Sequence, residues 1–175
     1  INYHQSLIDF KDKLLTLKDK HILIVGDYDC DGICATTITK RLLEHLGIKN
    51  SYYIPSRIDE GYGLSEKIVS IAHKHHYDVI ITVDNGVSAT SSISLANSLG
   101  IKVMIIDHHE YVDIPDCYGF IHPNLLDKDF NKLSAGALCY LLSTLFYEDD
   151  YTLVLGGLSI LSDMVGVLNY NRYLL

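Results

Sequence analysis

The chain alternates between short apolar runs and longer segments in which apolar residues recur every three or four positions. Short continuous apolar runs are typical of strands that are buried on both faces of a parallel sheet. The runs predicted to form strands are residues 21–27, 51–54, 78–83, 101–106 and, more briefly, 118–121. The segments predicted to form helices are residues 4–19, 33–46, 64–76 and 88–99, with a glycine closing the second and the fourth.

From about residue 133 onward the pattern is helical and predicts two pieces, with Gly156 and Gly157 inside or between them. Strands that alternate with helices are connected by right-handed crossovers, which gives a mainly parallel sheet with helices on both faces. We therefore predict one α/β domain over residues 1–175 that ends in a helical part.

Three of the predicted strands end in aspartate, at Asp27, Asp84 and Asp107. The carboxyl ends of parallel strands line one crevice, in which open α/β sheets bind their ligands. Carboxylates that are crowded and buried there repel each other, at a cost of several kcal/mol unless a cation offsets their charge. The pattern therefore predicts a metal site.

The first strand leads into an aspartate loop, Asp27-Tyr28-Asp29-Cys30-Asp31-Gly32. Alternate side chains of an extended segment point the same way, so the three carboxylates would face one another. Hard divalent cations prefer such oxygen ligands. The loop is thus the first candidate for a metal-binding segment.

Three other interpretations of the aspartate loop are open. A calcium-binding EF-hand loop needs a glutamate at its twelfth position, where this chain has Ile38. A phosphatase of the haloacid-dehalogenase type would use Asp29 as a nucleophile, with Asp31 and Gly32 completing its motif. In a purely structural turn, Asp31 would cap a helix that starts at Ile33, but that does not explain the acids at the other strand ends.

The other two strand ends carry their own candidates. Asp84 is followed by Asn85-Gly86, a turn signal that predicts a strand-to-helix corner. Asp107-His108-His109 combines carboxylate with imidazole, a mixture that suits manganese-like ions and two-metal hydrolases. Adjacent histidines on a loop can also be solvated without any function. This pair therefore indicates a metal site chiefly in combination with the other acids.

The bulk composition narrows the class of protein. The 175 residues are 48% hydrophobic and 21% charged, and no apolar run approaches the roughly 20 residues that cross a bilayer. The four cysteines form no C-x-x-C pair, so we expect a reduced, cytoplasmic protein with no zinc ribbon. The net charge of -8 argues against a nucleic-acid surface, although two divalent ions would cancel about half of it.

No signal peptide is evident, and the start at Ile1 suggests an excised fragment of a longer protein.

With these residues assembled, the chain resembles the DHH phosphoesterase superfamily and, within it, the RecJ-like single-strand-specific exonucleases. Five motifs carry the resemblance in the family's order and span nearly the whole chain. They are GDYDCDG at 26–32, SRIDEGYGLSE at 56–66, TVDNGVS at 82–88, IDHHE at 106–110 and LSDMVGVLNYNR at 161–172.

The resemblance implies a set of metal ligands. Asp29 and Asp84 would hold a first ion, and Asp84 would bridge it to a second. The residues implied for the second ion are Asp31, Asp84, His108 and Asp163. Many relatives carry a histidine where this chain has Val25, a departure for which Asp27 would compensate. The mixed ligand set favours Mn²⁺, with Mg²⁺ possible.

The resemblance also implies contacts to the substrate. His109 would contact the scissile phosphate and steady its charge, which makes His109 and Asp84 the catalytic candidates. Arg57 and the amides near Ser134 and Gly136, at an expected helix N-terminus, are candidate phosphate contacts. An exposed salt bridge with a neighbouring acid is the alternative for Arg57.

The implied activity is hydrolysis of phosphodiesters by two metal ions, in 5′→3′ degradation of single-stranded DNA during repair and recombination. The alternative within the superfamily is hydrolysis of pyrophosphate, cyclic dinucleotides or short oligonucleotides. A binding module without metals is disfavoured because every expected acid is present. RecJ-like enzymes grip DNA with a second domain that these residues lack, so we expect metal binding but little processive nuclease activity.

Overall fold

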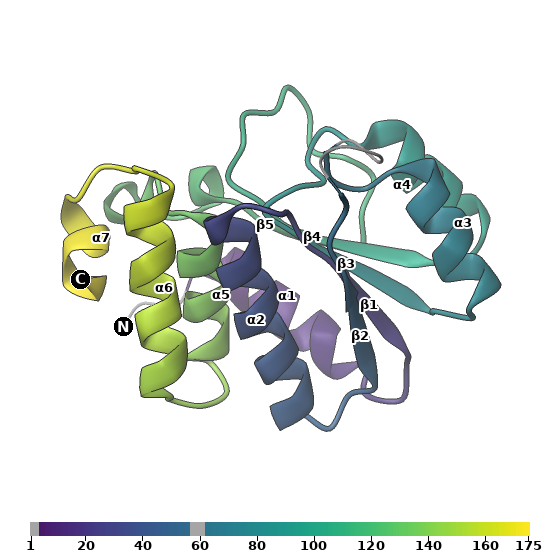
Figure 1. The fold of residues 1–175 in the computed structure, drawn as a ribbon, viewed down its shortest axis with the longest axis horizontal. Coiled ribbons are helices and arrows are strands. Elements are labelled where there is room, and N and C mark those ends of the chain that lie inside the picture. The colour runs from purple at the N-terminus through teal and green to yellow at the C-terminus, as the bar shows by residue number, and fades with distance from the viewer. Residues whose placement is uncertain (1–3, 57–61) are drawn as a thin grey trace.

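A computed structural model describes residues 4–56 and 62–175. Its centre is a five-stranded sheet in the order β2-β1-β3-β4-β5, and every neighbouring pair of strands is parallel (Figure 1). The strands are β1 (Ile22–Val25), β2 (Asn50–Tyr53), β3 (Val79–Val83), β4 (Lys102–Ile106) and β5 (Gly119–Ile121). The predicted parallel α/β sheet is confirmed, including its short last strand.

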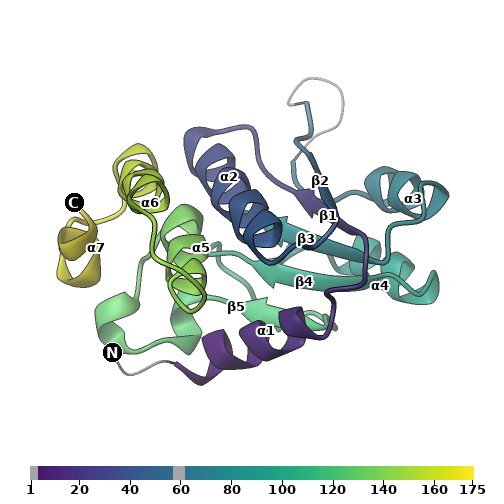
Figure 2. The same ribbon diagram turned by 90° about the horizontal axis from the view of Figure 1, so that it is seen from below.

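Helices cover both faces of the sheet (Figures 1 and 2). The described helices are α1 (Gln5–Leu15), α2 (Cys30–His45), α3 (Glu66–Lys74), α4 (Thr90–Ser98), α5 (Ala135–Ser143), α6 (Asp150–Ser162) and α7 (Asn169–Leu174), with 3-10 turns at Pro123–Leu125 and Lys128–Phe130. Helices α3 and α4 pack on one face, whereas α1, α2 and α5 pack on the other. Helix α6 lies on α2 and α5 and forms an outer helical layer with α7.

The strands divide their side chains between two apolar cores. Ile22 and Ile24 of β1 point into the core beneath α1, α2 and α5, whereas Leu23 and Val25 point into the core beneath α3 and α4. This alternation follows from the two-residue period of a strand. Because both faces are covered, the central strands β1, β3 and β4 are apolar at nearly every position, which is the pattern that made them recognisable.

Some details of the predicted helices were wrong. Helix α1 ends at Leu15 and not at residue 19, because the chain turns there and sends Leu17 into the core. The C-terminal part forms three helices, not two, and Gly156 and Gly157 lie inside α6. Both glycines allow close packing: a Cβ at Gly156 would lie 3.1 Å from Tyr140 Cβ, and one at Gly157 would lie 3.0 Å from the Leu174 carbonyl oxygen.

No helix within residues 4–56 and 62–175 has the length and apolar character needed to cross a membrane. The four cysteines, Cys30, Cys34, Cys117 and Cys139, are free, and Cys34 and Cys139 are buried.

A buried amide ties the sheet to the segment before α3. Asn85 is 0% exposed, and its Nδ2 donates to the carbonyl oxygens of Val25 (3.0 Å) and Val83 (2.9 Å). Its Oδ1 accepts from the Leu64 amide at 3.1 Å. These three bonds join the ends of β1 and β3 to a loop that borders the candidate site.

We expect Asn85→Ala to lower the free energy of unfolding by about 2–4 kcal/mol, because it leaves an amide and two carbonyl groups buried without their partner. Urea denaturation measures this change. The exposed Asn131→Ala serves as a control and should stay within about 0.5 kcal/mol of the unmodified chain. Equal effects of the two substitutions would contradict a bracing role for the Asn85 amide.

Candidate metal centre

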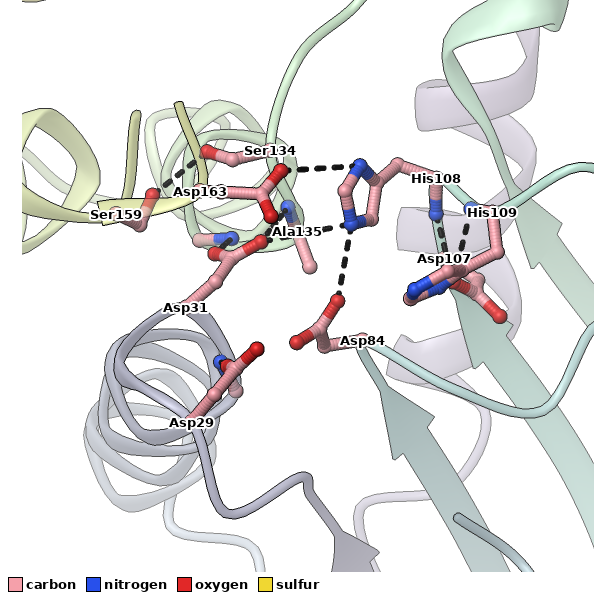
Figure 3. A network of polar contacts seen from close by, with 12 residues as sticks. Asp29, Asp31, Asp84, Asp107, His108, His109, Ser134, Ala135, Ser159 and Asp163 are labelled. Carbon is pink, nitrogen blue, oxygen red and sulfur yellow. Dashed lines mark hydrogen bonds and ion pairs between the residues drawn. The ribbon is translucent and has the colours of Figure 1, made fainter. Parts of the chain in front are cut away.

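Acids follow three neighbouring strands at one edge of the sheet, and Figure 3 shows two of them, Asp84 and Asp107. Asp84 and Asp107 come directly after β3 and β4, and Asp27 follows β1 by two residues. Each is at most 3% exposed. The strands are parallel and adjacent, so their carboxyl ends meet at this edge, as the sequence pattern predicted.

The aspartate loop is not extended throughout. Helix α2 begins at Cys30, and Asp29 is its N-cap, with Oδ1 accepting from the Gly32 amide at 2.8 Å. The predictions that Asp31 caps a helix starting at Ile33, and that the three aspartates alternate in an extended segment, were therefore wrong. The first helical turn instead directs Asp31 toward α5.

Asp31 is held by the N-terminus of α5. Its carboxylate accepts from the amides of Ala135 (2.9 Å) and Gly136 (2.8 Å). Amides at a helix N-terminus favour a negative charge, so they stabilise the ionised form of Asp31. A Cβ at Gly136 would lie 2.5 Å from Ser159 Oγ and 3.2 Å from Asp31 Oδ1, so only glycine allows this approach.

This arrangement corrects the role expected of Ser134 and Gly136. Ser134 is 0% exposed, caps α5, and its Oγ lies 2.7 Å from Ser159 Oγ on α6. The Gly136 amide donates to Asp31. Both residues thus support Asp31 from within the protein and are not open to an external phosphate. Arg57, the other predicted phosphate contact, lies outside the described residues.

His108 is the centre of the cluster of acids. Its Nε2 lies 3.1 Å from Asp84 Oδ1 and 3.6 Å from Asp31 Oδ2, and its Nδ1 lies 3.6 Å from Asp163 Oδ2 (Figure 3). Asp163 reaches this position from the C-terminal end of α6. Three acids that lie far apart in the chain are thereby brought together around one imidazole.

The potential ligand atoms form overlapping groups, each with all its atoms within 4.8 Å of one another. The groups are Asp27, Asp29 and Asp84; Asp31, His108 and Asp163; and Asp84, His108 and His109. Asp84 belongs to two of them, and its backbone adopts a left-handed conformation with a φ of 61°. A non-glycine residue in that conformation is uncommon and is often held in place at a functional site.

Electrostatics shows why these acids suit a cation. Burial raises the pKa of Asp84 to about 7, and the charges of Asp31 and Asp29 act in the same direction against the hydrogen bond from His108. Burial likewise raises the pKa of Asp31 to about 6 despite its two amide donors. Burial alone would lower the pKa of His108, but Asp84, Asp31 and Asp163 raise it to about 9. The oxygen-rich set with one imidazole fits Mn²⁺ or Mg²⁺, which would relieve the repulsion between the carboxylates.

Asp107 is a supporting residue, a role that its place in the Asp107-His108-His109 sequence does not distinguish from that of a metal ligand. It accepts hydrogen bonds from the amides of Val87 (3.0 Å), His108 (2.8 Å) and His109 (3.2 Å). Its Oδ1 also lies 2.7 Å from Nδ1 of His109. Burial by itself would raise the pKa of Asp107, but these bonds bring it below its usual value. The hydrogen bond with Asp107 in turn raises the pKa of His109.

We expect Asp107→Asn to reduce any hydrolytic activity of the site by about 10–100-fold, the usual cost of losing a residue that orients a reactive group. The amide keeps the shape but not the charge that pairs with His109. Manganese binding, measured by calorimetry beside kcat, should change by no more than a few fold. Asp113→Asn, in the exposed loop beyond β4, is the matched control. Loss of metal binding together with activity would show that Asp107 is itself a ligand.

A cavity of about 440 Å³ adjoins the cluster and is bordered by Tyr62, Leu64, Ser91, Asp107 and His109 among others. The Tyr62 hydroxyl donates to the Asp84 carbonyl oxygen at 2.6 Å and lies 3.2 Å from His109 Nε2. Tyr62 was not selected from the sequence either, although it lies in the second of the five motifs. The half-exposed side chain of His109 therefore faces a space that a substrate could enter.

Comparisons with known proteins show the family to which this chain belongs. Residues 21–158 match the DHH family, N-terminal domain. The single-stranded-DNA-specific exonuclease RecJ of Escherichia coli K12 is 40% identical over 129 residues, which cover 71% of this chain and 22% of that protein. RecJ of Bacillus subtilis 168 is 31% identical over 160 residues, or 89% of this chain and 20% of that protein. The chain thus spans about a fifth of the length of these relatives.

A crystal structure of exonuclease RecJ bound to manganese superposes with a TM-score of 0.84 at 26% identity, covering 98% of this chain and 46% of that one. The structure of RecJ with Mn²⁺ from Thermus thermophilus shares the fold, with a TM-score of 0.83 at 23% identity, 98% coverage of this chain and 26% of that chain. The motifs, the sheet and the match over residues 21–158 agree, and the chain belongs to the DHH family.

Proposed function

We propose that this chain is the catalytic domain of a metal-dependent phosphodiester hydrolase, a 5′→3′ exonuclease that acts on single-stranded DNA. The observation that carries the proposal is the position of Asp84, whose carboxylate lies within 4.8 Å of potential ligand atoms of Asp27 and Asp29 and also of those of His108 and His109. A carboxylate shared in this way is the bridge that a two-metal hydrolase needs. Relatives named as single-stranded-DNA-specific exonucleases supply the substrate class.

We assign the ions to the donors as follows. Asp27, Asp29 and Asp84 would hold one divalent cation, with Asp27 standing in for the histidine that Val25 replaces. Asp31, Asp84, His108 and Asp163 would hold the other. Manganese suits this mixture of carboxylates and imidazole and is bound in two of the similar structures, whereas a third contains magnesium.

The ions and the side chains of the site would have separate roles in the proposed hydrolysis. Bound cations would lower the pKa of a water molecule and stabilise charge on the phosphoryl oxygens. His109, whose pKa is raised by its hydrogen bond with Asp107, would donate a hydrogen bond to a phosphoryl oxygen from the side that faces the cavity. The Tyr62 hydroxyl would hold the Asp84 backbone in the conformation that aims its carboxylate at both groups of donors.

Binding of long single-stranded DNA needs a basic groove for the backbone and aromatic side chains on which the bases stack. The net charge of -8 does not favour such a groove on these residues. We therefore propose that residues 1–175 form the hydrolytic unit, and that the strand-gripping surface corresponds to the remaining four-fifths of the relatives.

The proposal is tested by adding Mn²⁺ or Mg²⁺ to the chain and following thermal unfolding and hydrolysis. A ligand at 100 times its Kd stabilises a protein by about 2.7 kcal/mol, so a metal-dependent rise in Tm is expected. We expect cleavage of a chromogenic phosphodiester and slow, non-processive release of nucleotides from 5′-labelled single strands, with little attack on duplexes. Preference for pyrophosphate or dinucleotides would favour the alternative within the superfamily, and metal binding without any hydrolysis would refute the assignment.

A further inference from the structure

His122 is a buried histidine at the end of β5, outside the group of potential metal ligands. Its Nδ1 accepts from the Asn124 amide at 3.1 Å, so that nitrogen carries no hydrogen. In a neutral imidazole the hydrogen then lies on Nε2. That nitrogen is 2.9 Å from the His109 carbonyl oxygen and can only donate to it. The two contacts together define one tautomer and one ring orientation.

The surroundings of His122 shield its hydrogen bond with the His109 carbonyl oxygen from water. The ring is 3% exposed and lies between Tyr111, at 4.7 Å between centroids, and Phe120, at 5.8 Å. Burial also lowers the pKa of His122, which favours the neutral ring that its two hydrogen bonds require. A hydrogen bond that is shielded from water is stronger than an exposed one, and its loss would leave a buried carbonyl group unpaired.

His109 is consequently held at two points. Its ring is paired with Asp107, from the end of β4, and its backbone is fixed by His122, from the end of β5. Strand pairing continues into this region, because the Asp107 amide donates to the Ile121 carbonyl oxygen at 3.2 Å. A loop residue with a half-exposed side chain would otherwise have rotational freedom in both its backbone and its ring.

We infer that His122 is a positioning residue that acts through His109, by fixing the backbone from which the His109 side chain reaches the reacting phosphate. This inference rests on the proposed role of His109 as the phosphate contact. Positioning residues of this kind typically change activity by about 10–100-fold while leaving the substrate-binding groups in place.

The test compares two substitutions. His122→Phe fills the same space without a donor, whereas His122→Gln places an N–H near the position of Nε2. We expect kcat to fall at least about 10-fold for the phenylalanine variant, with KM and the Kd of Mn²⁺ within about threefold, and the glutamine variant to recover most of that loss. His45→Phe, which keeps a ring beside Tyr147 far from the site, is the matched control.

A second readout needs no activity and separates this inference from the proposed function. Nitrogen-15 NMR of the unmodified, metal-free chain should show His122 protonated at Nε2 alone, and the His109 Nδ1 proton should be shifted downfield by its bond to Asp107. In His122→Phe that downfield signal should weaken or broaden. An Nδ1-protonated His122, an unchanged His109 signal in the phenylalanine variant, or a glutamine variant as impaired as the phenylalanine one would each overturn the inference. The absence of hydrolysis by the unmodified chain would instead count against the proposed function.

Discussion

Asp84→Asn is expected to abolish metal-dependent phosphodiester hydrolysis, with a loss well beyond the roughly 10–100-fold typical of supporting residues. Asparagine keeps the size of the side chain and tolerates the left-handed backbone at this position, where φ is 61°. It removes the one charge that both groups of donors share, so both ions would lose affinity. Calorimetry with Mn²⁺ and a chromogenic phosphodiester assay measure the two effects.

The same substitution should leave the metal-free chain at least as stable as before. Asp84 is a buried carboxylate whose charge is opposed by burial and by Asp31 and Asp29, and removing that charge relieves the repulsion. The Tm should therefore hold or rise without metal, while the metal-induced increase in Tm disappears. Asp19→Asn, at an exposed position in the loop after α1, is the control. Undiminished turnover by Asp84→Asn would exclude a bridging role.

Gly32→Ala is expected to be the most damaging substitution among the glycines of the site. A Cβ there would lie 2.6 Å from Asp27 Cβ and 2.7 Å from the Asp27 carbonyl oxygen. A backbone atom cannot move aside as a flexible side chain can, so the aspartate loop would shift. Overpacking of this kind costs about 1–3 kcal/mol or more, and we expect the Kd of Mn²⁺ to rise at least about 10-fold because Asp27 and Asp29 move with the loop.

Gly166→Ala provides the matched comparison, since nothing lies within 4 Å of the Cβ it would introduce. Chemical denaturation with and without Mn²⁺ separates the loss of stability from the loss of metal binding. A Gly32→Ala variant with unchanged stability and affinity would show that the loop adapts to the extra methyl group, and that the close approach of Asp27 is not required.

The parts of the fold that sequence reasoning recovers are those with local causes. Apolar runs such as residues 79–83 are buried on both sides, and parallel neighbours put the acids that follow them at one edge. The start of α2 was misplaced because Asp29 and Asp31 are both good N-caps, and the choice between them depends on tertiary contacts. Asp31 is drawn to amides more than 100 residues away in the chain, which no local pattern contains.

Supporting residues were harder to recognise than candidate ligands. Asp107 bonds mainly to backbone amides, and His122 bonds to a backbone carbonyl group. Every residue has such backbone groups, so these contacts cannot be recognised from the residue types in the sequence. Asp163 has no local motif of a ligand either. It was found by resemblance, and the structure brings it to His108 by packing α6 on the outer side of α2 and α5.

That packing places one member of the cluster on a different layer from the others. The acids from the strand ends and from the aspartate loop are arranged by the sheet and α2, whereas the position of Asp163 depends on the packing of α6. A chain that had formed its sheet without its outer helices would lack the Asp163 carboxylate at the metal centre. Tight binding of the ion would thus report that α6 has docked, and the cation would cross-link two layers that are otherwise joined by side-chain packing, the Ser134–Ser159 hydrogen bond and the Arg41–Asp149 ion pair.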